Sequence, residues 1–174
     1  MNRLIEPSTI ELTQEQSAIL DRLVAGRGRI LGPYKIWIHS PAVASGMEQL
    51  GTFLNKSSSL SPREVELCIL LIASHWNADY VRRVHERTAK KLGFTDEFIN
   101  ALATRPRPML ADPHENCVYQ FASALIAGEK LSDAEFKATE TVIGRSGIAE
   151  VLVLLGYYTS VALGMKSHDV PVPE

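Results

Sequence analysis

Apolar positions recur with helical spacing along most of the chain, and residues that start helices stand in front of several of these segments. The sequence SPRE at 61–64 places a serine at the N-cap, a proline at the first helical position and a glutamate three residues after the cap. Thr13, Asp112 and Ser132 begin similar sequences, each with Gln or Glu three residues later. The pattern therefore predicts helices that begin just after these four positions.

Glycines indicate where several of these helices end. Gly93 follows AKKL, Gly128 follows ASALIA, and Gly164 lies near the end of the last apolar segment. Strand signals are nearly absent, so the sequence predicts an all-α fold, a compact helical domain of about eight helices. The expected helices lie at about residues 14–24, 41–54, 62–74, 78–92, 95–103, 113–127, 133–144 and 147–164.

Two of the apolar segments are hydrophobic nearly all round, namely VELCILLIA at 65–73 and VLVLLGYYTSVAL at 151–163. Such helices must be covered on every face, so both are expected to be central and heavily buried. The length of 174 residues and the 45% hydrophobic content suit one domain, residues 1–174, with a single core. A domain of this size can enclose one such helix, so the second is expected to meet another subunit.

Charge and hydropathy argue against nucleic acid and membrane as partners. The formal net charge is −2, with 18 basic and 20 acidic residues mixed along the chain, so no basic surface for nucleic acid is expected. No run approaches the roughly 18 consecutive apolar residues of a membrane span, and the N-terminus lacks the apolar stretch of a signal peptide. We therefore expect a cytoplasmic protein that does not insert into a membrane.

The only two cysteines, Cys68 and Cys117, each lie inside an apolar helical segment. Their spacing fits neither a disulfide framework nor a CxxC redox or zinc motif, so we interpret them as buried structural thiols. No two histidines have the i, i+4 spacing of metal ligands on a helix. The sequence therefore predicts neither a metal site nor a bound cofactor.

The most informative polar residue is Glu66, because the seven residues that follow it, LCILLIA, all favour burial. A carboxylate in that setting needs a partner. His85 is a candidate, but in one continuous helix it would lie about 28 Å away at about 1.5 Å per residue. The stretch SHWNAD at 74–79 favours helix ends over helix interiors, so we expect a break there, with Asn77 as the N-cap of the next helix.

An antiparallel return after this break brings Tyr80, Arg82 or His85 towards the first helix. Each of these residues also has an ordinary structural interpretation. A histidine midway along an amphipathic helix is usually a surface or structural residue. A glutamate in the first helical turn can simply compensate the helix dipole, an effect of under about 1 kcal/mol.

The remaining candidates have structural interpretations too. Trp76 and Tyr80 are by default core or interface aromatic residues. His39 is either a loop ligand or only the residue before a helix cap, and His114 is expected to be exposed.

These residues, in this order, resemble the carboxymuconolactone decarboxylase family, which includes the alkylhydroperoxidase-D-like proteins. Glu66 matches the family's glutamate on a buried helix, and His85 matches its histidine. Ala78 and Val81 stand at the two cysteine positions of the redox members. The decarboxylase-like branch typically reads Ala-Glu-Tyr-Glu-Trp-x-x-His, which residues 78–85 follow except where Val81 and Arg82 replace Glu and Trp. The similarity covers most of residues 30–165.

The resemblance implies a non-redox member, since peroxide-linked dithiol chemistry needs two thiols that the motif lacks. Dithiol peroxidase activity is therefore not expected. The named activity of the non-redox branch is the cofactor-free decarboxylation of gamma-carboxymuconolactone. Loss of CO₂ leaves a carbanion delocalised into the lactone carbonyl, so the enzyme must accommodate enolate charge and deliver one proton to carbon.

The favoured hypothesis is thus a lyase that acts on a small carboxylated lactone or ring acid, with His85 as acid/base and Glu66 as its orienting partner. Arg82 is expected to pair with a substrate carboxylate and Tyr80 to hydrogen-bond the carbonyl.

Trp37, His39 and Trp76 are expected to form the pocket wall around this substrate. The resemblance also implies a homo-oligomer, either a trimer or a hexamer. The alternative from another class is a non-catalytic family member that binds a small molecule or serves as a structural oligomer.

Overall fold

A computed structural model describes residues 1–102 and 108–173 of the chain. Within these ranges the chain forms one short 3-10 helix and eight α-helices, and no strand occurs there, which confirms the predicted all-helical fold. The elements are η1 (Pro7–Thr9), α1 (Gln14–Arg27), α2 (Tyr34–Trp37), α3 (Pro41–Lys56), α4 (Pro62–His75), α5 (Asp79–Lys91), α6 (Asp96–Ala101), α7 (Pro113–Ile126) and α8 (Asp133–Ser167).

The predicted helix starts are confirmed, and their capping groups make the expected hydrogen bonds. The side chains of Thr13 and Ser61 each accept a hydrogen bond from the backbone N–H three residues later, and the side chain of that later residue accepts one from the backbone N–H of the cap residue. Ser132 forms the same reciprocal pair with Glu135. Asp112 accepts bonds from two backbone N–H groups of α7. Local sequence chemistry alone therefore sets where these helices begin.

The predicted helix ends are correct at Gly93 and Gly128, which take left-handed φ values of 89° and 72°. Gly164 was expected to end the last helix, and that expectation is wrong, because α8 continues to Ser167. A Cβ added at Gly164 would lie 3.2 Å from Cδ1 of Ile36, so this glycine permits close packing instead of ending the helix.

The predicted division of the C-terminal segment into two helices, at 133–144 and 147–164, is confirmed at Gly144. This residue forms a kink within α8, and its φ of 67° and ψ of 175° are non-helical. Glycine adopts this conformation without steric cost, which explains why the break falls there. The elements η1 and α2 were not predicted, because segments of three and four residues are too short to show the apolar spacing of a helix.

Contacts within the chain group its residues into two compact units, whereas the sequence analysis expected one domain. The first unit contains Met1–Ser57 and Gly164–Pro171, and the second contains Ser58–Leu163 together with the last residues of the chain. In the first unit α3 packs against α1 and α2. Its buried side chains include Ile19, Leu23 and Tyr34. The candidate pair Glu66 and His85 belongs to the second unit.

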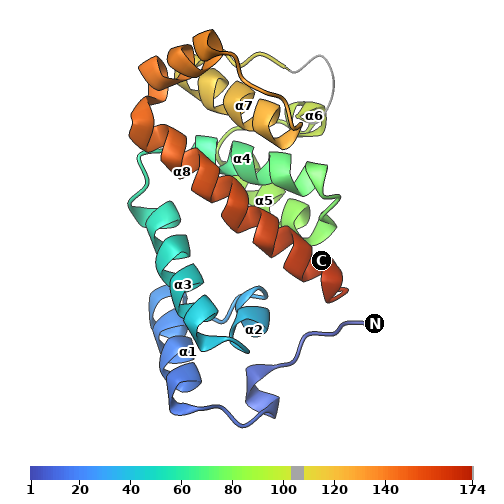
Figure 1. The fold of residues 1–174 in the computed structure, drawn as a ribbon. Helices are drawn as coiled ribbons and strands as arrows, with labels where there is room; N and C mark the ends of the chain where they lie inside the picture. Colours follow the sequence, from blue (N-terminus) through green and yellow to red (C-terminus); the bar gives the residue numbers. More distant parts are fainter. Residues whose placement is uncertain (103–107, 174) are drawn as a thin grey trace. The chain divides into compact units, whose positions relative to one another are not determined.

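Helix α4 is the centre of the second unit, where it packs against both α5 and α7 (Figure 1). Every residue from Glu64 to Ala73 is buried, which confirms the predicted central helix at 65–73. Full burial of one large aliphatic side chain contributes about 1.5–3 kcal/mol, so this helix supplies a large part of the hydrophobic core. It also carries two glutamates into that core.

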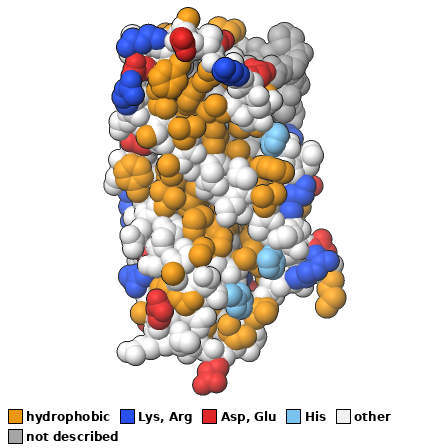
Figure 2. All heavy atoms as spheres, in the orientation of Figure 1, with side chains coloured by type: hydrophobic (Ala, Val, Ile, Leu, Met, Phe, Trp, Pro, Cys, Tyr) orange, Lys and Arg blue, Asp and Glu red, His pale blue; other side chains and the backbone are white. Residues whose placement is uncertain are grey.

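Helix α8 is less buried than the sequence predicts. Leu152 and Leu163 remain 49% and 42% exposed, so residues 151–163 are not covered on every face within a single chain. The expectation that another subunit covers the remaining face stays a prediction. Figure 2 shows hydrophobic side chains at the surface of the face that carries α8. Val151, Leu154 and Ala162 on the inward side are fully buried. One side of this helix is therefore buried and the other exposed, although both sides are apolar.

One window of α8 also meets the length and composition criteria for a membrane-crossing helix. Eighteen of its residues have a mean hydropathy of 1.6, and 44% of that window is buried inside the protein. The core helix of a soluble protein meets the same criteria, so the window is weak evidence for a membrane span.

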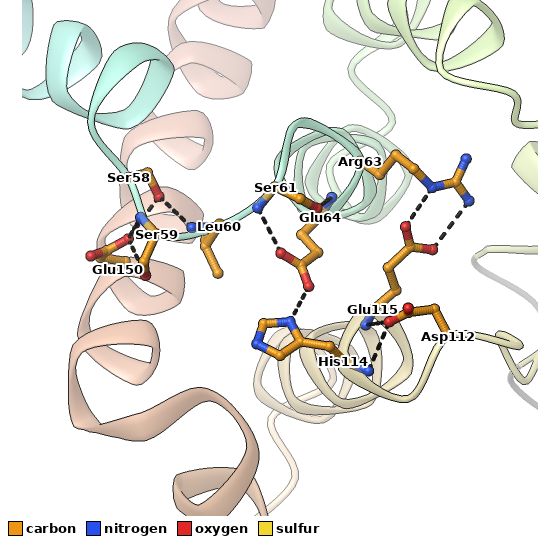
Figure 3. A network of polar contacts seen from close by, with 10 residues as sticks. All are labelled: Ser58, Ser59, Leu60, Ser61, Arg63, Glu64, Asp112, His114, Glu115 and Glu150. Atoms are coloured by element: carbon orange, nitrogen blue, oxygen red, sulfur yellow. Dashed lines mark hydrogen bonds and ion pairs between the residues drawn. The ribbon is translucent and has the colours of Figure 1, made fainter.

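A network of polar contacts ties α4 to its neighbours (Figure 3). Glu64 is only 2% exposed, and one of its carboxylate oxygens accepts the Ser61 backbone N–H at 2.7 Å. The other oxygen contacts Nδ1 of His114 at the start of α7. The expectation that His114 is exposed is correct, but its imidazole also partners a buried carboxylate.

Arg63 connects three helices at the same end of α4. Its Nε and Nη2 contact the two carboxylate oxygens of Glu115 on α7, and its Nη1 donates to the carbonyl of Leu92 after α5. The guanidinium also lies 4.0 Å from the ring centroid of Phe94. The hydrogen bond to Glu115 is the main reason why the pKa of Arg63 is raised further above its ordinary value.

Glu150 of α8 holds the loop that leads into α4. Its Oε2 accepts the Ser58 hydroxyl and the Ser59 backbone N–H, each at 2.7 Å. Burial opposes ionisation of Glu150, but the hydrogen bonds from Ser58 and Ser59 outweigh it, and the pKa of this carboxyl lies below its ordinary value.

Replacing Arg63 with alanine should lower the free energy of unfolding by about 1–2 kcal/mol, because the paired contacts to Glu115 and the ring contact with Phe94 are lost together. Arg63→Lys should recover only part of this, since an ammonium cannot reproduce the forked contact. Chemical denaturation monitored by circular dichroism measures both effects. Arg83→Ala, at an exposed position of α5, is the matched control and should change stability by less than about 0.5 kcal/mol. Equal losses in the two alanine variants would contradict a special role for Arg63.

Candidate active site

A sharp reversal of the chain between α4 and α5 creates the candidate site. Helix α4 ends at His75 and α5 begins at Asp79, so the predicted break within 74–79 is confirmed. Asn77 was expected to be the N-cap of α5, and this is wrong, because Ala78 occupies that position without a side-chain cap. Asn77 instead takes a left-handed φ of 47°, which asparagine tolerates better than most residues.

The reversal brings Glu66 and His85 into direct contact. Nδ1 of His85 lies 2.9 Å from Oε2 of Glu66, although the residues are 19 positions apart in sequence. The expectation that they approach within hydrogen-bond range is confirmed. Their side chains are only 18% and 9% exposed, so little water competes for the contact.

This contact distinguishes the two nitrogens of the His85 imidazole. An ionised carboxylate only accepts hydrogen bonds, so Nδ1 must carry a proton and donate it to Glu66. In the neutral ring Nε2 is then the unprotonated nitrogen. The arrangement therefore presents one defined basic nitrogen, held by a carboxylate on the other side of the ring.

Tyr158 of α8 completes the surroundings of the imidazole, and the sequence analysis did not single it out. Its ring centroid lies 5.2 Å from that of His85, with the planes at 88°, and Tyr157 packs against it at 5.2 Å. Tyr158 is 8% exposed. The sequence offers little signal for this contact, because an aromatic residue in an apolar helix is by default a core residue.

The other predicted site residues lie in several places. Trp76 caps the end of α4, where its ring meets that of His75 edge-on at 4.9 Å. Tyr80 is half-buried in the first turn of α5. Trp37 is buried and His39 is exposed in the first unit. Their predicted roles as pocket wall stay predictions.

The guanidinium of Arg82 is bound by two other side chains of the protein. Its Nε contacts Glu86 at 2.6 Å and its Nη2 contacts Asn100 at 2.7 Å. A substrate carboxylate that bound Arg82 through these two nitrogens would have to displace both partners. The predicted contact between Arg82 and substrate therefore has a structural competitor that the sequence did not indicate.

Two cavities border the helices of the second unit. One, of about 450 Å³, is lined by Arg63, Phe94, Phe98 and residues of the 109–112 segment. The other, of about 390 Å³, lies between α7 and α8, and Cys117 lines it. Neither lining includes Glu66 or His85. The predicted cavity beside the pair therefore stays a prediction.

The positions that match the family's cysteines contain no sulfur. Ala78 and Val81 are both buried beside the reversal. Cys68 is completely buried on α4, and burial, with the charge of Glu64 as a smaller cause, raises the pKa of its thiol to about 12. Burial also raises the pKa of Cys117. A thiolate is therefore strongly disfavoured at Cys68 at neutral pH, and burial disfavours it at Cys117 as well.

Side chains of the types that ligate metals are dispersed over the helices. Among residues 1–102 and 108–173, no group of three or more His, Cys, Asp or Glu side chains has an arrangement that could hold a metal ion.

The family profile of carboxymuconolactone decarboxylases matches residues 41–124, which include both Glu66 and His85. Residues 41–124 belong to the carboxymuconolactone decarboxylase family. The match begins with α3 and extends into α7, so it includes the whole α4–α5 reversal. A comparison with curated protein sequences finds no match.

Solved structures show the same fold. An uncharacterized peroxidase-related protein from Silicibacter sp. TM1040 superposes with a TM-score of 0.76 at 14% identity, over 99% of this chain and 92% of that one. A cysteine-to-alanine variant of the debrominase Bmp8, in complex with 2,3,4-tribromopyrrole, gives a TM-score of 0.69 at 10% identity, over 99% and 91% of the two chains. Apo Bmp8 gives 0.68 at 9% identity, over 97% and 90%. At these identities the likeness shows a shared fold and not a shared reaction.

The burial of Cys68 has a measurable consequence. Because its pKa is about 12 instead of the ordinary 9.0, the thiolate fraction near neutral pH should be about a thousandfold smaller than in the unfolded chain. In a Cys117→Ser variant, labelling by an aromatic disulfide reagent should therefore be at least that much slower in the native protein than in urea. The reciprocal Cys68→Ser variant is the control and should react faster. Rapid labelling of native Cys68 would show that its thiol is accessible and ionisable.

Proposed function

We propose that this carboxymuconolactone decarboxylase family member is a cofactor-independent lyase that decarboxylates a small carboxylated lactone or ring acid. The observation that carries the proposal is the 2.9 Å contact between His85 and Glu66, which leaves Nε2 of the imidazole for a substrate. The absence of sulfur at Ala78 and Val81 favours this reaction class over thiol chemistry.

The reaction needs one proton to be delivered to carbon. As the bond between the ring carbon and the carboxylate breaks, CO₂ leaves and the electron pair delocalises into the conjugated lactone carbonyl. The Nε2–H of a protonated His85 then donates its proton to the ring carbon beside that carbonyl. The neutral imidazole regains a proton from solvent, and Glu66 stabilises the imidazolium at Nδ1 in each cycle.

The other predicted residues have supporting roles in this proposal. Tyr80 lies five residues before His85 on α5, and its proposed role is to hydrogen-bond the carbonyl on which charge develops. Arg82 would bind the substrate carboxylate in exchange for Glu86 or Asn100, its partners in the free protein. Trp76, at the end of α4, is proposed as pocket wall.

Substrate turnover tests the proposal. A panel of unsaturated lactones and ring acids, each with a carboxylate on the carbon conjugated to the carbonyl, should include at least one compound that releases CO₂ with the wild-type protein. His85→Ala should lower kcat/KM for it by about 10²–10⁴-fold, and Glu66→Gln should lower it by about tenfold or more.

The control for this experiment is His168→Ala, which removes an imidazole from the first unit and should leave turnover unchanged. Turnover that is unaffected by His85→Ala would refute the assigned proton donor. A folded protein that turns over no member of the panel would favour the alternative, a non-catalytic binding or structural role.

We also propose that the working unit is a homo-oligomer, either a trimer or a hexamer. Support comes from the resemblance to the family and from Leu152 and Leu163, which lie three turns apart on one side of α8 and remain exposed. A second copy of the chain is the partner that this surface would meet.

Light scattering at micromolar concentration should therefore give a mass three or six times the 19.2 kDa of one chain. Leu152→Glu should shift the protein towards the monomer, because a carboxylate cannot be buried there without a partner. Val24→Glu, at an equally exposed valine of α1, should not. A wild-type mass near 19.2 kDa would contradict self-association.

A further inference from the structure

The contact between Glu66 and His85 fixes only one point of the imidazole. A hydrogen bond at Nδ1 restrains that nitrogen, but the ring can still rotate about the Cβ–Cγ bond, a torsion with broad wells in histidine. Rotation by half a turn exchanges the position of Nδ1 with that of Cδ2, and the defined basic Nε2 is then lost. A second restraint is therefore needed if the imidazole is to present one nitrogen in one direction.

Tyr158 is positioned to supply that restraint. Its ring lies perpendicular to the imidazole, with the planes at 88° and the centroids 5.2 Å apart. An edge-to-face pair at this separation is attractive because the positive edge of one ring meets the negative face of the other, an effect of about 0.5–1.5 kcal/mol. A ring packed in this way also obstructs rotation of its neighbour.

The surroundings of Tyr158 hold its own ring in place. Tyr157 contacts it at 5.2 Å with the planes at 66°. Leu154 and Ala162, one turn before and one turn after it on α8, are completely buried. Tyr158 is thus anchored in the core and presents a fixed surface to His85.

We propose that Tyr158 is a positioning residue that holds the His85 imidazole in the orientation set by Glu66. Its ring keeps Nδ1 on the carboxylate, so the neutral imidazole exists as the Nδ1–H tautomer and Nε2 stays available. The effect on catalysis rests on the proposed acid/base role of His85, whereas the effect on the tautomer does not. Any aliphatic side chain could fill the volume, but only a ring provides the perpendicular contact.

The test is the tautomer of His85 in the resting protein, measured through long-range ¹H–¹⁵N couplings of the full chain labelled with ¹⁵N-histidine. The His85 signals are assigned by their loss in His85→Ala. The wild-type protein and Tyr158→Phe should both show a single Nδ1–H tautomer above the titration range. Tyr158→Leu should show a mixture of the two tautomers, because the ring is no longer restrained. Phe121→Leu, which removes a buried aromatic ring from α7, is the control and should retain the single tautomer.

A folded Tyr158→Leu protein that keeps a single Nδ1–H tautomer would overturn the proposal. If Tyr158→Leu does not fold, Tyr158→Met supplies the same loss of the ring with a more adaptable side chain. Once a substrate is identified, Tyr158→Leu should lower kcat by about tenfold with little change in KM. Tyr158→Phe should have a kcat close to that of the wild-type protein. If the tautomer responds to Tyr158→Leu while His85→Ala leaves turnover unchanged, the positioning role stands and the proposed function fails.

Discussion

A carboxylate on a buried apolar helix must have a partner, and the contact between Glu66 and His85 meets that requirement. Glu66 lies in the first turns of α4, where its neighbours Val65, Leu67 and Cys68 are all in the core. An isolated buried charge is prohibitively costly, so the helix is stable only if another element supplies a hydrogen-bond donor. Helix α5 does so, and it reaches Glu66 because the chain reverses at Asn77. The site and the reversal are therefore consequences of the same constraint.

Glu64, the second buried glutamate of α4, also has a histidine partner, but on another side of the helix. Glu64 and Glu66 are two residues apart, which corresponds to about 200° around a helix. Glu64 therefore points to His114 on α7, while Glu66 points to His85 on α5. Each carboxylate contacts a histidine through Nδ1.

Each contact joins a buried carboxylate of α4 to a histidine of a different helix. Together they restrict how α4 can be rotated between α5 and α7. Only the pair with His85 lies beside the chain reversal. It is also the pair within the family motif.

Features of the fold that depend on residues close together in the sequence could be predicted. The caps at Thr13, Ser61 and Ser132 were predicted correctly, because a capping box depends on residues only three positions apart. The pairing of Glu66 with His85 could be predicted because burial required a partner and the residues at 74–79 allowed the chain to turn.

Features that depend on long-range packing were not predictable in this way. Gly164 has the appearance of a helix end in the sequence, but the structure shows that it allows a close approach to Ile36. The contacts of His114 with Glu64 and of Tyr158 with His85 join different helices, and no spacing in the sequence encodes them.

The central step of the proposed reaction is the transfer of a proton between His85 and carbon. Exchange of hydrogen for deuterium at the carbon beside the carbonyl of enol-lactones, followed by ¹H NMR in D₂O, measures that step without requiring decarboxylation. The wild-type protein should catalyse exchange of at least one such compound, and His85→Ala should reduce the rate to that of the buffer. Exchange at an equal rate in the two proteins, or at the buffer rate with the wild-type protein across the whole series, would contradict a proton-transfer role for the Glu66–His85 pair.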